Sequence, residues 1–101
     1  MSKVEIFQGK DGFYFRIVEE NGSVVLISES YTTRANAKKG AESVLRNVNS
    51  SSGVVRKIAK NGKHFFVVRS SKNGKILGKS SPYSSQTGRE WGITKVSKAR
   101  I

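Results

Sequence analysis

Cysteine is missing from this chain of 101 residues, and its absence excludes both disulfide bonds and metal sites built from thiolates. A chain without disulfides suits a reducing compartment, so we expect a cytoplasmic protein. Long hydrophobic runs are missing too, because no segment approaches the roughly 20 apolar residues of a membrane span. The opening stretch MSKVEIFQGK has no signal-peptide core. We therefore expect one soluble domain, residues 1–101, with no membrane partner.

Side chains that perform catalysis are also scarce. The sequence holds one histidine, His64, and one aspartate, Asp11, and its glutamates are spread mainly over the first half. Acid–base chemistry needs two such groups held together, and no pair of this kind is evident. A glycine-rich phosphate loop between a strand and a helix is absent as well. We therefore predict a protein that is not an enzyme, with no catalytic residues, metal or cofactor, and we interpret His64 as a surface turn residue.

Acidic residues become rare after Ser52. Residues 1–52 carry seven basic and six acidic side chains, whereas residues 53–101 carry twelve basic side chains and Glu90 alone. The second half therefore holds +11 of the net charge of +12. So uneven a field attracts polyanions, although basic surfaces also serve solubility. The charge points to nucleic acid or an acidic protein surface as the partner.

The sequence matches itself when it is shifted by 52 positions without a gap. Eight pairs of residues are identical under this shift: Ile6 and Ile58, Phe13 and Phe65, Asn21 and Asn73, Gly22 and Gly74, Ser28 and Ser80, Tyr31 and Tyr83, Gly40 and Gly92, and Val44 and Val96. They fall on a turn, a strand, a helix entrance and a helix interior. This pattern favours two repeats, 1–49 and 53–101, joined by a polar linker near 47–53.

Each repeat has the pattern of three strands followed by a helix. Runs of β-branched and aromatic residues predict strands at 4–7, 13–18 and 24–28, and again at 54–59, 64–69 and 75–80. Asn21-Gly22 and Asn73-Gly74 predict two-residue type I′ hairpin turns. One unit cannot bury its sheet alone, so we predict an α+β fold. In this fold tandem β-β-β-α repeats share one antiparallel sheet, with two helices packed on one face.

The helices have recognisable starts and buried stripes. Thr33 and Ser85 are placed to cap them. The expected stripe of the first helix is Ala37, Ala41, Val44, Leu45 and Val48, and that of the second is Ile93 and Val96, with Ile101 at its end. Gly92 matches Gly40, and we expect both to serve close packing of helix on sheet.

The first repeat resembles the YegP-like family of small proteins built from one or two such units. The residues that carry the likeness are Tyr14-Phe15-Arg16, Asn21-Gly22, Ser28-Glu29-Ser30-Tyr31, Ala35, Ala37-Lys38 and Gly40-Ala41-Glu42-Ser43-Val44. The second repeat keeps Asn73-Gly74, Ser80, Tyr83, Gly92 and Val96. The resemblance implies a β(3)-α-β repeat fold with two repeats in one sheet and exchanged C-terminal strands, and it implies no activity. Because the chain stops right after the second helix, we expect its final strand to be short or missing.

Basic residues of the second repeat form the predicted binding footprint. Two Lys-Asn-Gly-Lys turns supply loop lysines of the kind that contact phosphates, and the last helix carries Trp91, Lys95 and Lys98 on one face away from the core. The predicted binding residues are Lys60, Lys63, Lys72, Lys75, Lys79, Arg89, Trp91, Lys95, Lys98 and Arg100. Trp91 stacks on a base or enters a protein pocket, or else it folds over the end of the sheet in place of the missing strand.

The sheet face without helices is a second candidate site. The expected outer residues are Tyr14, Arg16, Val18, Val25 and Ile27 in the first repeat, and Phe66, Val68, Leu77 and Lys79 in the second. Tyr14, Arg16 and Phe66 then form a platform on which single-stranded nucleic acid stacks. The alternatives are an apolar patch buried in a dimer or by a partner, or a face covered by the chain itself. Arg69 falls on the expected core face, so either its stem packs over Gly78 or the register of the second repeat differs.

Two functions remain open on the sequence. The first is a small basic module that binds nucleic acid through phosphate contacts from the second repeat. The alternative is an accessory protein, of a phage or stress type, that docks on an acidic partner. The chain is expected to act as a monomer or a homodimer.

Overall fold

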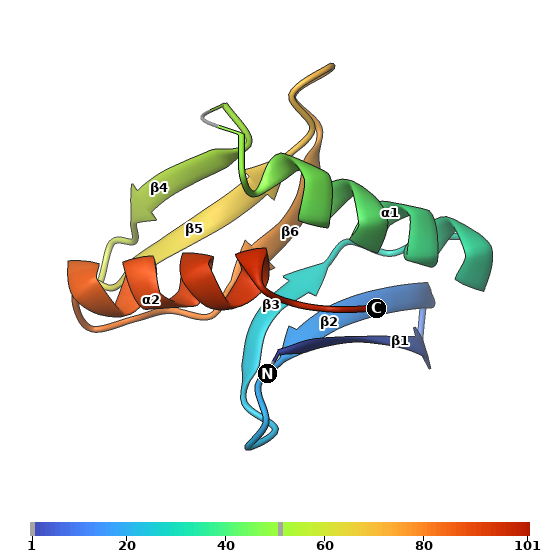
Figure 1. Ribbon diagram of the computed structural model, residues 1–101, viewed down its shortest axis with the longest axis horizontal. Coiled ribbons are helices and arrows are strands. Elements are labelled where there is room, and N and C mark those ends of the chain that lie inside the picture. The colour runs from blue at the N-terminus through green and yellow to red at the C-terminus, as the bar shows by residue number, and fades with distance from the viewer. Residues whose placement is uncertain (1, 51) are drawn as a thin grey trace.

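The computed structural model describes residues 2–50 and 52–101. Along the chain lie β1 (Lys3–Gly9), β2 (Gly12–Val18), β3 (Val24–Ser28), α1 (Arg34–Asn47), β4 (Val54–Ile58), β5 (His64–Arg69), β6 (Ile76–Ser80) and α2 (Gln86–Ser97). The six strands form one sheet in the order β1-β2-β3-β6-β5-β4, and every neighbouring pair is antiparallel (Figure 1). The predicted α+β class and antiparallel sheet are therefore confirmed. No helix in the described ranges has both the length and the apolar character needed to cross a membrane.

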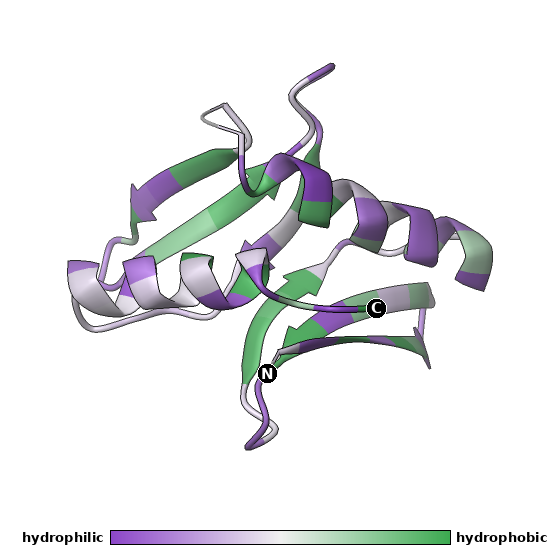
Figure 2. Ribbon diagram, in the orientation of Figure 1, coloured by the Kyte–Doolittle hydropathy of each residue, from purple (hydrophilic) through white to green (hydrophobic). Residues whose placement is uncertain are grey.

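The two halves of the chain meet at the centre of the sheet. There β3 pairs with β6, and Leu26 lies opposite Ser80. One buried cluster combines side chains of the strands and of both helices, including Phe15, Phe66, Val44 and Val96. Figure 2 shows hydrophobic residues along β3 and β5, the strands that α2 contacts. The helices and the core-facing side of the sheet thus stabilise each other by burying a common apolar surface.

Both helices begin where the sequence predicts. The Thr33 hydroxyl accepts a hydrogen bond from the Asn36 amide at 3.0 Å, and the Ser85 hydroxyl accepts one from the Gly88 amide at 3.0 Å. Each bond satisfies an amide that a helix start otherwise leaves without a partner. The predicted stripe of α1 is buried, except that Leu45 is half-buried. Of the predicted α2 residues Val96 is buried and Ile93 half-buried, whereas Ile101 is exposed and lies outside the stripe.

The first Asn-Gly turn differs from the two-residue turn that the sequence predicts. The Glu19 amide donates to the Ser23 carbonyl, so three residues lie between them, and Gly22 alone of these has a positive φ, of 86°. The added residue is compensated by a bulge, because the pairing shifts by one residue between Ile17 and Val18. Val25 is the unpaired residue, and both Val25 and Leu26 are buried in the core.

The hairpin loops of the second half are each one residue longer, and this overturns the uniform shift of 52. In the first loop of the first half, two residues separate the paired Gly9 and Gly12. In the corresponding loop of the second half, three residues separate Ala59 from Lys63, whose carbonyl accepts a hydrogen bond from the Ala59 amide. The next loop encloses three residues in the first half but four in the second, between Ser70 and Lys75. Equivalent residues are therefore 50 positions apart in β1 and β4, 51 in β2 and β5, and 52 in β3 and β6.

The chain ends beside the first strand. The Val4 amide donates to the Arg100 carbonyl at 2.8 Å, the Arg100 amide donates to the Ser2 carbonyl, and Lys3 and Arg100 form a parallel bridge (Figure 1). An isolated bridge therefore lies where we expect a final strand that is short or missing. The predicted linker near 47–53 includes Ser51, which lies outside the described residues.

Candidate functional site

The sheet face that points away from the helices has two differently occupied halves. In the first half, Tyr14 and Arg16 lie on this open face as predicted. The Tyr14 ring stacks on Phe7 with centroids 5.6 Å apart, and the Arg16 guanidinium lies 4.6 Å from the Phe7 centroid. Arg16 also donates from Nε to Glu5 Oε1 at 2.8 Å. The rings and the cation of this half are therefore already paired with each other and with a carboxylate.

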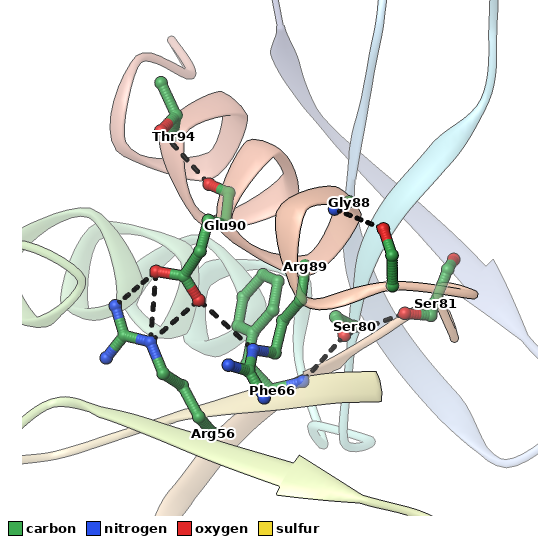
Figure 3. Close-up of polar contacts among 9 residues, drawn as sticks. Arg56, Phe66, Ser80, Ser81, Gly88, Arg89, Glu90 and Thr94 are labelled. Carbon is green, nitrogen blue, oxygen red and sulfur yellow. Dashed lines mark hydrogen bonds and ion pairs between the residues drawn. The ribbon is translucent and has the colours of Figure 1, made fainter. Parts of the chain in front are cut away.

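Phe66, the third member of the predicted platform, is wrongly placed by the sequence. Its side chain is 0% exposed and lies in the core, and its amide donates to the Ser80 hydroxyl at 2.9 Å (Figure 3). The cause is the longer loop before β5, since a shift of one residue moves every side chain of a strand to the other face. Phe65 therefore takes the place on the open face that was predicted for Phe66.

Lysines surround the half-buried ring of Phe65. Lys57 lies directly opposite Phe65 on β4, and Lys79 Nζ is 5.0 Å from the Phe65 centroid. Together with Lys60 of the β4–β5 turn, they line an open depression of about 540 Å³ that also includes Ile58, Ala59, Ser80 and Pro82. This volume falls within the range of about 300–1,000 Å³ that is typical of small-molecule sites. We call Lys57, Lys60, Phe65 and Lys79 the Phe65 patch.

The lysines of the Phe65 patch have no carboxylate at ion-pair distance in the described parts of the chain. The one acidic residue of the second half, Glu90, is engaged elsewhere. Arg56 donates to it from Nε and Nη2 at 2.8–3.1 Å, and Arg89 donates from Nε at 3.1 Å (Figure 3). The hydrogen bond from Arg56 is the main cause that lowers the pKa of Glu90 below its ordinary value. The charge of the Phe65 patch is therefore not neutralised by the protein itself.

Arg89 does not belong to an exposed basic footprint, contrary to the prediction. Arg89 is 7% exposed, and its guanidinium forms an ion pair with Glu90. A charge in such a place needs a partner, and Glu90 provides one. Arg89 therefore serves the packing of α2 and is not presented to a ligand.

The two Lys-Asn-Gly-Lys loops do not form one cluster. Lys60 and Lys63 lie in the β4–β5 turn, whereas Lys72 and Lys75 lie in the β5–β6 loop, at the other end of β5. A strand of six residues is about 20 Å long, at about 3.3 Å per residue. Lys75 lines one depression together with Lys39 of α1, and Lys72 lines another together with Arg46 of α1. The predicted footprint is thus split between two ends of the sheet.

The outer face of α2 brings together Trp91, Lys95 and a residue of the first half. Trp91 is 44% exposed, meets the Tyr83 ring edge-on at 6.2 Å, and lies 5.4 Å from Lys95 Nζ. Lys95 Nζ is also 3.5 Å from Glu19 Oε1. Burial, and then the charge of Glu19, raise the pKa of Tyr83. Trp91 therefore covers Tyr83 while keeping part of its ring in solvent, and Lys95 is already paired.

Lys98 and Arg100 lie near the start of the chain. With Lys95, Ser97 and Ala99 they line a depression of about 690 Å³ that also contains Ser2 and Glu20. The backbone of Arg100 is fixed on β1, and both basic side chains are exposed. This region carries charge of both signs, unlike the Phe65 patch.

Two further predictions are wrong, one about the open face and one about His64. Val18, Val25, Val68 and Leu77 are buried, so of the expected apolar patch only Ile27 is exposed. His64 lies in β5 and not in a turn, and its Nδ1 is buried with no hydrogen-bond partner among the described residues. Within the same residues, no group of three or more His, Asp or Glu is placed to hold a metal ion.

Sequence reasoning missed Lys57 and Phe65 as members of the site. Their common signal is alternation: once the β4–β5 turn is given three residues, Lys57 and Phe65 fall opposite each other on the open face. The loop length itself has no strong marker in the sequence, because Asn-Gly occurs in hairpin turns of several lengths.

Comparisons with known proteins agree with this architecture. The family model "Domain of unknown function (DUF1508)" matches residues 10–52 and again 59–99. The UPF0339 protein PA0329 of Pseudomonas aeruginosa is 36% identical over 99 residues, which are 97% of this chain and 89% of that protein. The UPF0339 protein YegP of Escherichia coli K12 is 37% identical over 84 residues, 83% of this chain and 76% of that protein.

Two solved structures are similar to this one. The solution NMR structure of the UPF0339 protein SO3888 from Shewanella oneidensis has a TM-score of 0.87 and 34% identity, over 97% of this chain and 83% of that one. The solution NMR structure of YegP from E. coli, titled a protein of unknown function, has a TM-score of 0.85 and 34% identity, over 95% and 83%. The chain therefore belongs to the DUF1508 family, among the UPF0339 proteins related to YegP.

Proposed function

We propose that this chain is a small, non-catalytic protein of the cytoplasm that binds nucleic acid through phosphate contacts made by its second half. The observation that carries the proposal is the Phe65 patch, whose lysines surround an open depression and have no carboxylate partner among the described residues. Lysine and arginine side chains commonly position a protein on nucleic acid by contacting phosphates. Because such contacts release condensed counterions, the affinity is expected to fall steeply with salt.

The first half of the sheet supports the proposal by contrast. Strand pairing makes Val55 the counterpart of Glu5, and Lys79 the counterpart of Ile27. Glu5 neutralises Arg16 on the open face, whereas Val55 leaves the lysines of the second half without a carboxylate. The exchange thus concentrates positive charge on one half of the open face.

We propose further that the two halves are tandem copies of one β-β-β-α unit that have diverged in this way. Supporting this, the family model matches the chain twice. The same hydrogen bond also occurs in both halves. The Ser28 hydroxyl accepts a hydrogen bond from the Phe15 amide, and the Ser80 hydroxyl accepts one from the Phe66 amide. The boundaries 1–49 and 53–101 stay a prediction.

The test is fluorescence anisotropy of labelled oligonucleotides at two salt concentrations. The double variant Lys57→Gln/Lys79→Gln should weaken binding. It should also make the slope of log binding constant against log salt concentration shallower by about 1.4, since each phosphate contact to a single strand contributes about 0.7. Lys10→Gln/Lys38→Gln is the matched control, because it removes the same charge from exposed sites of the first half. The proposal fails if no probe binds at low salt, or if both double variants weaken binding equally.

An acidic protein surface is the second candidate partner. The loop with Lys72 and Lys75 favours it, because both lysines lie beside basic residues of α1. Lys75 lines one depression with Lys39, and Lys72 lines another with Arg46, where no aromatic residue takes part in the lining. Affinity capture with and without nuclease separates the two functions. A partner protein retained after nuclease treatment, and lost on Lys72→Gln/Lys75→Gln substitution, would favour protein docking.

A further inference from the structure

The Phe65 ring differs from its counterpart in the first half by having no ring stacked on it. Phe7 and Tyr14 are Cα partners on β1 and β2, as Lys57 and Phe65 are on β4 and β5. In the first half the two rings stack at 5.6 Å with an interplanar angle of 19°. Lys57 replaces the Phe7 ring in the second half, and in the described chain no aromatic side chain stacks on Phe65.

The space above Phe65 is open and positively charged. The ring forms part of the depression of about 540 Å³, between Lys57 on one neighbouring strand and Lys79 on the other. At present Lys79 Nζ lies 5.0 Å from the ring centroid, which is the geometry of a cation–π contact. A flat aromatic group could take that position, and the released amine would remain close enough to meet an anionic group attached to it.

We propose that the Phe65 ring stacks on a base of a single-stranded nucleic acid while the lysines of the Phe65 patch hold the adjoining phosphates. The inference rests on the proposed function and narrows its ligand to single strands. The base takes the position over the Phe65 ring that Lys79 Nζ now occupies. Sheet faces that expose aromatic rings among basic side chains bind single strands in this manner, and they tolerate any sequence because every base has a flat π face.

The geometry selects against duplexes. In a duplex both faces of each base are covered by neighbouring bases, so only the phosphates reach the patch and the ring makes no contact. Lysine contacts are common to both ligands, whereas the Phe65 contact exists for single strands alone. Single strands should therefore bind more tightly than duplexes of the same charge, and the difference should depend on one ring.

The experiment compares Phe65→Leu with Tyr14→Leu, its matched control on the open face of the first half. Phe65→Leu should weaken single-strand binding by about 5- to 150-fold, the range that base–aromatic stacking spans, with little change for a duplex. Tyr14→Leu should leave single-strand binding within about twofold, because that ring is already stacked on Phe7. Circular dichroism establishes that each variant is folded.

A third variant keeps the test decisive if Phe65→Leu does not fold. Phe65→Trp preserves an aromatic ring, and its fluorescence should be quenched by an added oligothymidine beyond any change that Trp91 gives in the unsubstituted protein. The stacking inference is overturned if Phe65→Leu and Tyr14→Leu bind alike, or if the introduced indole is not quenched. In those cases loss of binding in Lys57→Gln/Lys79→Gln would still support phosphate binding, so the two claims fail separately.

Discussion

Replacing Gly92 by alanine tests why both helices carry a glycine at the same place. Gly92 has no positive φ, so its backbone does not require glycine. What requires it is Tyr83: a Cβ on residue 92 would lie 2.5 Å from the Tyr83 hydroxyl oxygen and 2.8 Å from Cζ. Ordinary contacts of a Cβ begin at about 3.4 Å, so the tyrosine would have to move. The backbone of Tyr83 is held by two hydrogen bonds with His64 and its ring packs edge-on against Trp91, so the ring would have to rotate against that contact.

The magnitude follows from two opposing terms. Alanine favours a helix by about 1 kcal/mol over glycine, whereas overpacking of a tight contact costs about 1–3 kcal/mol. Gly88→Ala is the matched control in α2, because its Cβ would meet nothing closer than 3.3 Å. The gain in helix propensity is similar in the two variants and largely cancels. The free energy of unfolding of Gly92→Ala should therefore be about 2 kcal/mol lower than that of Gly88→Ala. For a domain of this size that is roughly 10 °C in Tm.

Thermal and urea unfolding of both variants measure this difference. Gly88→Ala should be as stable as the unsubstituted protein or slightly more so, and Gly92→Ala should be clearly less stable. Adding Tyr83→Phe to Gly92→Ala should restore part of the loss, because the nearest atom is then removed. Equal stability of Gly88→Ala and Gly92→Ala would refute the packing argument.

Two further predictions concern buried polar groups. Glu90→Gln should destabilise by about 1–2 kcal/mol, because it leaves the buried Arg89 guanidinium without its anion, although exposure of Glu90 screens part of the effect. Because folding depresses the pKa of Glu90, the stability that its carboxylate contributes is present above the ordinary pKa of 4.5 and is lost as pH falls through the folded-state pKa. The urea midpoints of Glu90→Gln and of the unsubstituted protein should therefore differ at pH 7 and converge toward pH 3. The control Glu42→Gln should not show the loss. Ser80→Ala should cost about 1–3 kcal/mol, because it leaves a buried amide without an acceptor, whereas a similar loss from Ala substitution at exposed Ser84 would contradict this reasoning.

The helices and the order of the elements were predictable from the sequence, because their signals are local. The hydroxyls of Thr33 and Ser85 stand directly before the helical stripes, and those stripes repeat every three or four residues. The tyrosines before both helices and the glycines within them follow the shift of 52 correctly, since no loop of variable length lies between them. Tyr14 and Arg16 were likewise placed correctly on the open face.

The faces of the second half were not predictable, because one residue in a loop reverses them. Phe66 was expected outside and Phe65 inside, yet the three-residue turn before β5 exchanges the two. Arg89 was expected in the binding footprint, and its burial was missed: its partner Glu90 is the next residue, but the pairing of Glu90 with Arg56, 34 positions away, leaves no local mark. The separation of the two lysine loops, in contrast, follows from topology alone, since the loops at either end of one strand cannot adjoin.

Mapping of amide chemical shifts during titration with a single-stranded oligonucleotide tests the central claim most directly. If the second half of the open face is the binding surface, the largest shifts will appear at Lys57, Phe65 and Lys79, near the end of β4, the start of β5 and the end of β6, and will vanish at high salt. Shifts that concentrate in the 70–75 loop or on α2, or that persist unchanged in Lys57→Gln/Lys79→Gln, would contradict it.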